Sequence, residues 1–186
     1  MPTAGAPTLR VHRVNSLEDR VRLLQKLVNF GEAAFDKASP PFGSIRDPEM
    51  RRIGLAVTEV CNARDDKCEL MAIYDFVKRN VRYTGDVVNK DTFSTAYRTL
   101  QFGGEDCDGH AVLCSVLAMV NGFTTKFRIT SNYGDSWDHI YCLAGLPKLG
   151  PRTFVALDTT LPGSTDARFG KEPPRAKFRD FGMNDV

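Results

Sequence analysis

The sequence has almost no net charge, no long apolar run and no leader-like start. Its 25 basic and 23 acidic residues leave a formal charge of +2, too little to indicate nucleic acid or an anionic membrane as the main partner. The segment Met1-Pro2-Thr3-Ala4-Gly5 lacks a basic stretch followed by an apolar one, and no run approaches the length that spans a bilayer. We therefore expect a cytoplasmic protein without nucleic-acid or membrane partners, unless an assembly such as a virion carries it out.

Cysteine is also scarce. Five cysteines form an odd set without the dense spacing of a small secreted scaffold, which suits a reducing compartment where thiols stay free. A free cysteine usually behaves as a small buried hydrophobe, so most of these residues are expected to pack in a core. They are Cys61, Cys68, Cys107, Cys114 and Cys142.

The length of 186 residues allows one compact domain, and the composition, 42% apolar and 26% charged, is that of an ordinary globular protein. We divide the chain into an N-terminal helical region (1–65), a core (66–165) and an irregular, basic C-terminal tail (166–186). The tail is rich in Pro and Gly with isolated Phe, which is typical of a solvated linker. Its basic and aromatic residues would also suit docking on a protein partner.

Apolar residues recur at helical spacing through the first two thirds of the chain. A first helix is predicted from about Leu17 to Phe30, and a second after the cap Asp47-Pro48. The remaining helices are a third that buries Leu70, Ile73, Phe76 and Val77, a short one over 94–100, and one over 107–120 that ends at Asn121-Gly122. Because the helix over 107–120 is apolar on nearly every face, it should be central and buried.

Three short segments of strand character follow: 124–130, 137–143 and 153–157. Turn-rich loops separate them, which indicates an antiparallel meander. The predicted fold class is α+β, with N-terminal helices and a central buried helix packed on an antiparallel β-sheet.

Cys107 stands at the predicted start of the central helix. There, unpaired backbone N–H groups and the helix dipole stabilise an anion such as a thiolate. The preceding Gly103-Gly104 lets the backbone approach a substrate carbonyl, because glycine has no Cβ. The neighbouring carboxylates of Asp106 and Asp108 would raise the thiol pKa unless they point away or cap the helix.

The chain has three histidines, and His12 lies before the first helix, so the base for Cys107 must be His110 or His139. His110 would lie one turn deeper on the same helix, a poor position for meeting a substrate. His139 is in a predicted strand and shares a face with Trp137. Asp158 ends the next strand, so hairpin pairing could bring its carboxylate against the His139 ring.

Three motifs occur in order: GGEDCDGHAVL at 103–113, WDHIY at 137–141 and FVALDTT at 154–160. Together, across roughly residues 70 to 165, they resemble the core of the transglutaminase-like superfamily, which is similar to papain-like cysteine proteases. The resemblance implies Cys107 as nucleophile, His139 as general base and Asp158 as the residue that orients it. It also implies Gln101 as an oxyanion donor beside the Cys107 backbone N–H.

Two positions depart from the family pattern: Gly109 stands where a second acid is usual, and the last motif reads Asp-Thr-Thr where many members have Asp-Pro-Thr. Neither change touches the three predicted catalytic residues. Gly109, in the first turn, would loosen the helix that presents the thiol.

We therefore expect a thiol-dependent amide hydrolase, a cysteine protease or deamidase, that acts on a protein or peptide through an acyl-enzyme thioester without a cofactor. Gly103, Gly104 and Trp137 are assigned to substrate binding. The alternatives are a transglutaminase, in which a lysine amine replaces water, and a non-catalytic structural or assembly protein such as a phage virion component.

A metal site is a further alternative. Cys107, His110 and Cys114 follow at helical spacing and would need a fourth ligand from Cys61 or Cys68. Because paired Cys-x-x-Cys knuckles are missing, we expect no metal.

Overall fold

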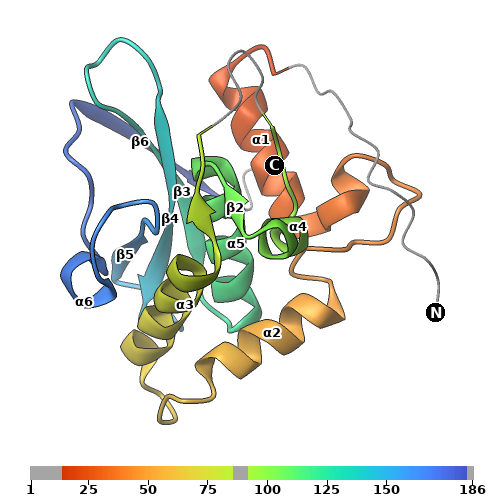
Figure 1. Ribbon diagram of the computed structural model, residues 1–186, viewed down its shortest axis with the longest axis vertical. Coiled ribbons are helices and arrows are strands. Elements are labelled where there is room, and N and C mark those ends of the chain that lie inside the picture. Colours follow the sequence, from red (N-terminus) through yellow and green to blue (C-terminus); the bar gives the residue numbers. More distant parts are fainter. Residues whose placement is uncertain (1–13, 86–91, 184–186) are drawn as a thin grey trace.

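The computed structural model describes residues 14–85 and 92–183. Helices and strands combine in an α+β arrangement, and the predicted fold class is confirmed. Figure 1 shows the sheet on one side of the molecule and helices α1, α2 and α4 on the other. The elements are α1 (Leu17–Phe30), η1 (Gly31–Ala34), α2 (Pro48–Thr58), α3 (Asp66–Asn80), β1 (Arg82–Tyr83), α4 (Ala96–Phe102), β2 (Gly104–Glu105), α5 (Cys107–Val120), β3 (Thr125–Ser131), β4 (His139–Leu146), β5 (Thr153–Leu157), α6 (Thr165–Arg168) and β6 (Lys177–Gly182).

Local capping residues set where the helices begin. Ser16 accepts the backbone N–H of Asp19 at the start of α1, and Asp47 does the same for α2, which has a proline in its first turn. Helix α1 ends at Gly31, whose positive φ of 55° and close approach to the Phe42 carbonyl leave no room for a Cβ. The predicted bounds of α1 are confirmed.

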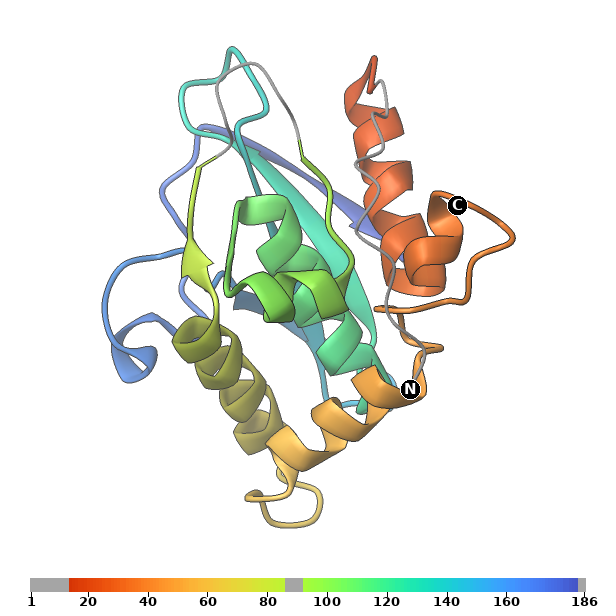
Figure 2. The same cartoon turned by 45° about the vertical axis from the view of Figure 1, so that its right-hand side comes forward.

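Helix α5 forms the centre of the core, as predicted. Twelve of its fourteen residues are buried. It contacts α1 to α4 on one side and strands β3 and β4 on the other. Figure 2 shows it running between the sheet behind it and α4 in front. Burial on all sides explains why the helix is apolar around its whole circumference.

The main sheet has four antiparallel strands in the order β5-β4-β3-β6. The three predicted strands form the expected meander β3-β4-β5. Alternate residues of β4 point to opposite faces, so Ile140 and Cys142 join the main core while Tyr141 and Leu143 form a second cluster on the other face. A separate two-stranded parallel pair, β1 with β2, leads into α5.

The C-terminal segment differs from its prediction. Part of the chain expected to be an irregular tail forms α6, and residues Lys177–Gly182 form β6 on the edge of the sheet. Phe181 and Met183 pack against the main core, and the Gln25 side chain of α1 donates a hydrogen bond to the Gly182 carbonyl at 2.5 Å. These contacts come from residues distant in sequence, so local composition did not reveal them.

The prediction that all cysteines are free is wrong for one pair. Cys61 and Cys68 form a disulfide, with their Cα atoms 5.8 Å apart. The short turn between α2 and α3 brings the two residues together. Cys107, Cys114 and Cys142 are free and buried. Because disulfides persist mainly in oxidising environments, the cysteine content no longer supports a reducing compartment.

Within the two described ranges, none of the helices combines the length and apolarity needed to cross a lipid bilayer.

Candidate active site

Cys107 is the first residue of α5, as the sequence predicted. The helix is capped by Asp106, whose Oδ1 accepts the backbone N–H groups of Asp108 at 3.0 Å and Gly109 at 3.2 Å. One of the two flanking carboxylates is therefore occupied in stabilising the helix N-terminus. The Cys107 side chain is largely buried, with a relative exposure of 8%.

The second flanking carboxylate belongs to an ion pair that the sequence did not reveal. Arg20, on α1, donates to Asp108 through Nε (3.0 Å) and Nη2 (2.7 Å). Asp108 is 1% exposed, so its charge is compensated inside the protein rather than by water. Arg20 lies outside the segment that resembles a known family, and nothing in its local sequence marks it.

The surroundings of Cys107 oppose ionisation of the thiol. Burial raises the thiol pKa well above its ordinary value, and the carboxylates of Asp108 and Asp106 raise it further. A backbone hydrogen bond with Ile140 and the charge of Arg20 act in the opposite direction. The thiol needs a nearby base to become a nucleophile.

His139 and Asp158 lie together, as the hairpin argument predicted. The His139 Nε2 and Asp158 Oδ2 atoms are 2.7 Å apart. The register pairs Cys142 with Leu157, which brings Asp158 diagonally opposite His139 on the same face of the sheet. Because Nε2 faces the carboxylate, Nδ1 is the nitrogen left to exchange a proton with another group.

The Cys107 thiol contacts the strand that carries His139. The Cys107 sulfur accepts a hydrogen bond from the backbone of Ile140, the residue after His139. In the described part of the chain, no hydrogen bond joins the Cys107 and His139 side chains themselves. The structure thus brings the Cys107 thiol and the His139 imidazole to neighbouring segments without a direct bond between them.

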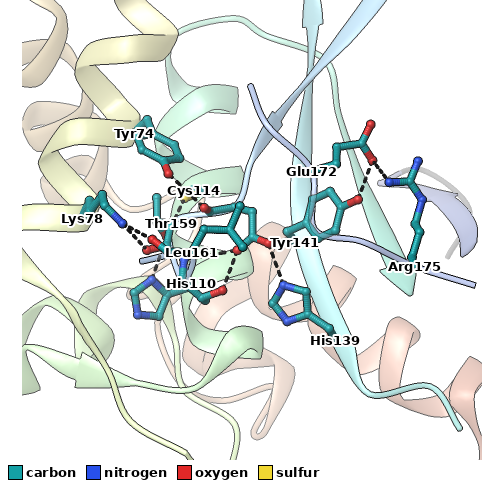
Figure 3. A network of polar contacts seen from close by, with 12 residues as sticks. Tyr74, Lys78, His110, Cys114, His139, Tyr141, Thr159, Leu161, Glu172 and Arg175 are labelled. Carbon is teal, nitrogen blue, oxygen red and sulfur yellow. Dashed lines mark hydrogen bonds and ion pairs between the residues drawn. The ribbon is translucent and has the colours of Figure 1, made fainter. Parts of the chain in front are cut away.

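Two threonines hold the turn that carries Asp158. The Thr160 hydroxyl donates to Asp158 Oδ1 at 2.6 Å, and its backbone N–H donates to the same atom at 3.2 Å. The Thr159 hydroxyl lies 2.7 Å from His110 Nδ1. Figure 3 shows this bond at the centre of a network that also includes Cys114. The Asp-Thr-Thr motif therefore supplies two hydroxyls that both form contacts, and the one on Thr159 is the one that the variation from Asp-Pro-Thr adds.

Two side chains of helix α3 form hydrogen bonds with the same turn. The Tyr74 hydroxyl donates to the Asp158 carbonyl at 3.1 Å, and Lys78 Nζ donates to the carbonyls of Thr159 and Leu161. Sequence reasoning missed both residues. Their spacing of four places them on one face of α3, but only the fold shows that this face meets the turn after β5.

His110 is not placed to serve as the base, in agreement with the sequence argument. It is 2% exposed. Burial lowers its pKa to about 4, so the imidazole stays neutral near pH 7. Its contact with Thr159 joins α5 to the Asp158 turn.

The packing of Glu105 explains why position 109 is a glycine. A Cβ at this position would lie 1.9 Å from Cγ of Glu105, which packs over the first turn of α5. The glycine that departs from the family pattern therefore makes room for a buried acidic side chain. The expectation that Gly109 loosens the helix neglected this packing.

The residues assigned to substrate binding lie on the segments around Cys107 and His139. Gly103 ends α4 in the left-handed conformation and Gly104 pairs with Arg82. Trp137 is half-buried beneath the Lys177 ammonium group, which lies 4.9 Å from the ring centroid. Gln101, the predicted oxyanion donor, is exposed on α4. The roles of these residues in binding and catalysis stay predictions.

The disulfide takes up both residues that were the candidates for the fourth ligand of the metal alternative. Cys61 and Cys68, the proposed fourth ligands, are bonded to each other. Across residues 14–85 and 92–183, no group of three or more His, Cys, Asp or Glu side chains is arranged to hold a metal ion. A groove of about 850 Å³ beside α3 and α6 contains none of the three predicted catalytic residues.

Comparison with known proteins gives a likeness of fold. No protein-family model and no curated protein matches the chain. A solved structure from Parabacteroides distasonis, provisionally called a protease, has a TM-score of 0.52 and 13% identity over 78% of this chain and 32% of its own. Another from Cytophaga hutchinsonii, provisionally called a cysteine protease, has a TM-score of 0.49 and 14% identity over 72% and 46%. The chain thus spans less than half the length of either, and at this identity the likeness concerns the fold alone.

Proposed function

We propose that the protein is a thiol-dependent amide hydrolase, a cysteine protease or deamidase of the transglutaminase-like type. The observation that carries the proposal is the 2.7 Å contact of His139 with Asp158, next to a free cysteine at the N-terminus of a buried helix. An imidazole oriented by a buried carboxylate, with a thiol close by, is the arrangement that activates a cysteine nucleophile. The name of the Parabacteroides distasonis fold neighbour is compatible with this reading.

The chemistry would proceed in two steps. His139 takes the Cys107 proton through Nδ1, the sulfur attacks the amide carbonyl carbon, and the imidazolium returns the proton to the leaving amine. Water then attacks the thioester with His139 as base, which releases the acid and the free thiol. Asp158 stabilises the imidazolium that forms in each step. The Cys107 backbone N–H and the Gln101 amide are the proposed donors to the oxyanion.

The proposed substrate is a protein or peptide, because extended backbone can approach Gly103 and Gly104 without meeting a Cβ. A lysine amine in place of water would make the same acyl-enzyme a transglutaminase. Three readouts on casein separate the outcomes: new amino termini indicate peptide cleavage, ammonia release without amine incorporation indicates deamidation, and incorporation of a fluorescent primary amine indicates cross-linking.

A non-catalytic structural or assembly protein is the second candidate. One observation favours it: Cys107 is 8% exposed and its thiol pKa is raised by burial. A scaffold that keeps the fold without using the thiol would have these properties too. The docking of β6 on the sheet leaves its outer face, with Phe178, available for a partner.

Replacing the nucleophile tests the proposal. We expect the Cys107→Ala variant to lose at least about 1,000-fold of the hydrolytic rate, since the covalent step depends on the sulfur. Iodoacetamide labelling, mapped by mass spectrometry, should disappear from the same peptide. The matched control is Cys142→Ala, which removes another buried free cysteine. This variant should keep both the hydrolytic rate and the labelling of Cys107. Hydrolysis at the wild-type rate in the Cys107→Ala variant would favour the scaffold.

A further inference from the structure

The ion pair between Arg20 and Asp108 lies directly beside the proposed nucleophile. Arg20 Nη2 and Nε approach Asp108 Oδ2 at 2.7 and 3.0 Å, and Nε approaches Oδ1 at 3.3 Å. The two N–H groups of the guanidinium thus engage the carboxylate from one side. Asp108 is 1% exposed and the Arg20 side chain 25%, so solvent screens the pair only on the arginine side.

The position of Asp108 makes its charge important for Cys107. The two residues are neighbours in the first turn of α5, where an uncompensated carboxylate would repel a thiolate. The helix N-terminus favours both anions, but its N–H groups at Asp108 and Gly109 are already bonded to Asp106. Arg20 is the cation that offsets the Asp108 charge. The charged and titratable groups on the elements packed around the thiol are Asp106 at the N-cap of α5, Asp108 and His110 of α5, Arg20 of α1, Glu105 of β2, His139 of β4 and Asp158 after β5.

An ion pair with a purely structural role would not need to lie beside the thiol. Helix α1 carries another ion pair, Arg179 with Glu18, in which both side chains are about half exposed and which lies away from the thiol. That pair can hold α1 against β6 without affecting Cys107. The Arg20 pair is buried on its acidic side and sits at the residue after the nucleophile, so it can both fasten α1 and change the charge that the sulfur experiences.

We infer that Arg20 is a positioning residue of the thiol site, which neutralises Asp108 and thereby lets the Cys107 thiolate form. Helix α1, which has no motif of its own, thus supplies part of the electrostatics of the site. This inference rests on Cys107 being the nucleophile of the proposed function.

The test is a charge cycle read at the thiol. The variants are Arg20→Gln, Asp108→Asn and the double change, with Arg179→Gln as the matched control on the exposed pair. The ionisation of Cys107 is followed by the pH dependence of its alkylation by iodoacetamide, mapped by mass spectrometry. The ultraviolet absorbance of the thiolate, with Cys107→Ala subtracted, follows the same ionisation without requiring access to the sulfur.

We expect Arg20→Gln to raise the thiol pKa by about one unit, which lowers the thiolate fraction at pH 7 about tenfold. Asp108→Asn should lower the pKa, and the double variant should return to the wild-type value or below it. Arg179→Gln should leave the titration unchanged. A thiol that titrates alike in all variants, that shifts in the same direction in Arg20→Gln and Asp108→Asn, or that does not ionise up to pH 11, overturns the inference.

Folding is checked in parallel by circular dichroism, because Arg20→Gln leaves a buried carboxylate without its cation. If that variant unfolds, two variants decide the question: Asp108→Asn, which removes the buried carboxylate and leaves only the partly exposed Arg20 charge, and the double variant, which removes both charges of the pair. The measurement uses no substrate. A Cys107 that titrates as expected in a protein that hydrolyses no amide would contradict the proposed function and leave the role of Arg20 intact.

Discussion

Asp158 forms hydrogen bonds with several residues of the candidate site. Its Oδ2 faces His139, its Oδ1 accepts two hydrogen bonds from Thr160, and its carbonyl accepts one from Tyr74. A carboxylate with both oxygens engaged and a relative exposure of 1% cannot rotate freely. The imidazole it contacts is therefore oriented by groups from two elements, α3 and the turn after β5.

His110 gives a prediction for stability at the residue scale. Its pKa is lowered to about 4 in the folded protein by burial, against about 6.5 in an unfolded chain. As the pH falls from about 6.5 to about 4, the unfolded chain binds a proton that the folded protein does not. The free energy of unfolding therefore decreases over this range, by up to about 3 kcal/mol for this residue.

The measurement is urea unfolding between pH 7 and pH 4 of the wild type and of His110→Asn. Asparagine can keep the hydrogen bond to Thr159 but does not titrate. Carboxylates titrate in both proteins alike, so the difference between the two curves isolates His110. Parallel curves would contradict a buried, neutral imidazole.

At the scale of the element, the start of α5 combines a cap, a free cysteine and a glycine within the four positions from Asp106 to Gly109. Asp106 caps the helix, and Gly109 admits the Glu105 side chain. The helix can begin abruptly at Cys107 because its first N–H groups are bonded by the cap rather than left to water.

Gly109→Ala is expected to destabilise the protein, although alanine normally stabilises a helix interior by about 0.5–1 kcal/mol over glycine. The new Cβ would lie 1.9 Å from Glu105 Cγ and 2.9 Å from its Cβ, so Glu105 or the helix must shift. We expect a loss of about 1–3 kcal/mol in the free energy of unfolding, typical of overpacking.

The second variant in this comparison is Glu105→Ala, alone and with Gly109→Ala. In the double variant the closest contact is removed, so the cost of the added methyl group should fall by at least about 1 kcal/mol. Urea unfolding of the four proteins gives this interaction energy directly. An unchanged cost would show that the clash with Glu105 is not what excludes a side chain.

At the scale of the whole molecule, the C-terminal segment completes the sheet and ties it to α1. Strand β6 pairs with β3 along its length, Gln25 bonds the Gly182 carbonyl, and Arg179 pairs with Glu18. These contacts join α1 and β6, which lie near opposite ends of the sequence.

The two phenylalanines of β6 test this arrangement, because they point to opposite faces. Phe181 packs against the main core, whereas Phe178 is 49% exposed, with Arg128 and Arg175 over its ring. We expect Phe181→Ala to lower the free energy of unfolding by about 3 kcal/mol and Phe178→Ala by about 1 kcal/mol or less. Thermal and urea unfolding measure both. Equal losses would indicate that β6 is not docked in this register.

The sequence by itself determined the features that depend on neighbouring residues. Ser16 and Asp47 predicted helix starts, the apolar run after Cys107 predicted a buried central helix, and the three segments of strand character predicted the meander. The pairing of His139 with Asp158 also followed from order along the chain, because a short hairpin brings successive strands side by side.

Only the tertiary structure decided the contacts between residues far apart in sequence. Three contacts could not be predicted from neighbouring residues, because each depends on how separate elements pack. They are the ion pair of Arg20 with Asp108, the pairing of β6 with the sheet, and the hydrogen bond of Tyr74 to the Asp158 carbonyl. The disulfide of Cys61 with Cys68 depends on the turn between two helices, which composition does not specify. Capping and periodicity act over a few residues, whereas charge compensation and packing act through space.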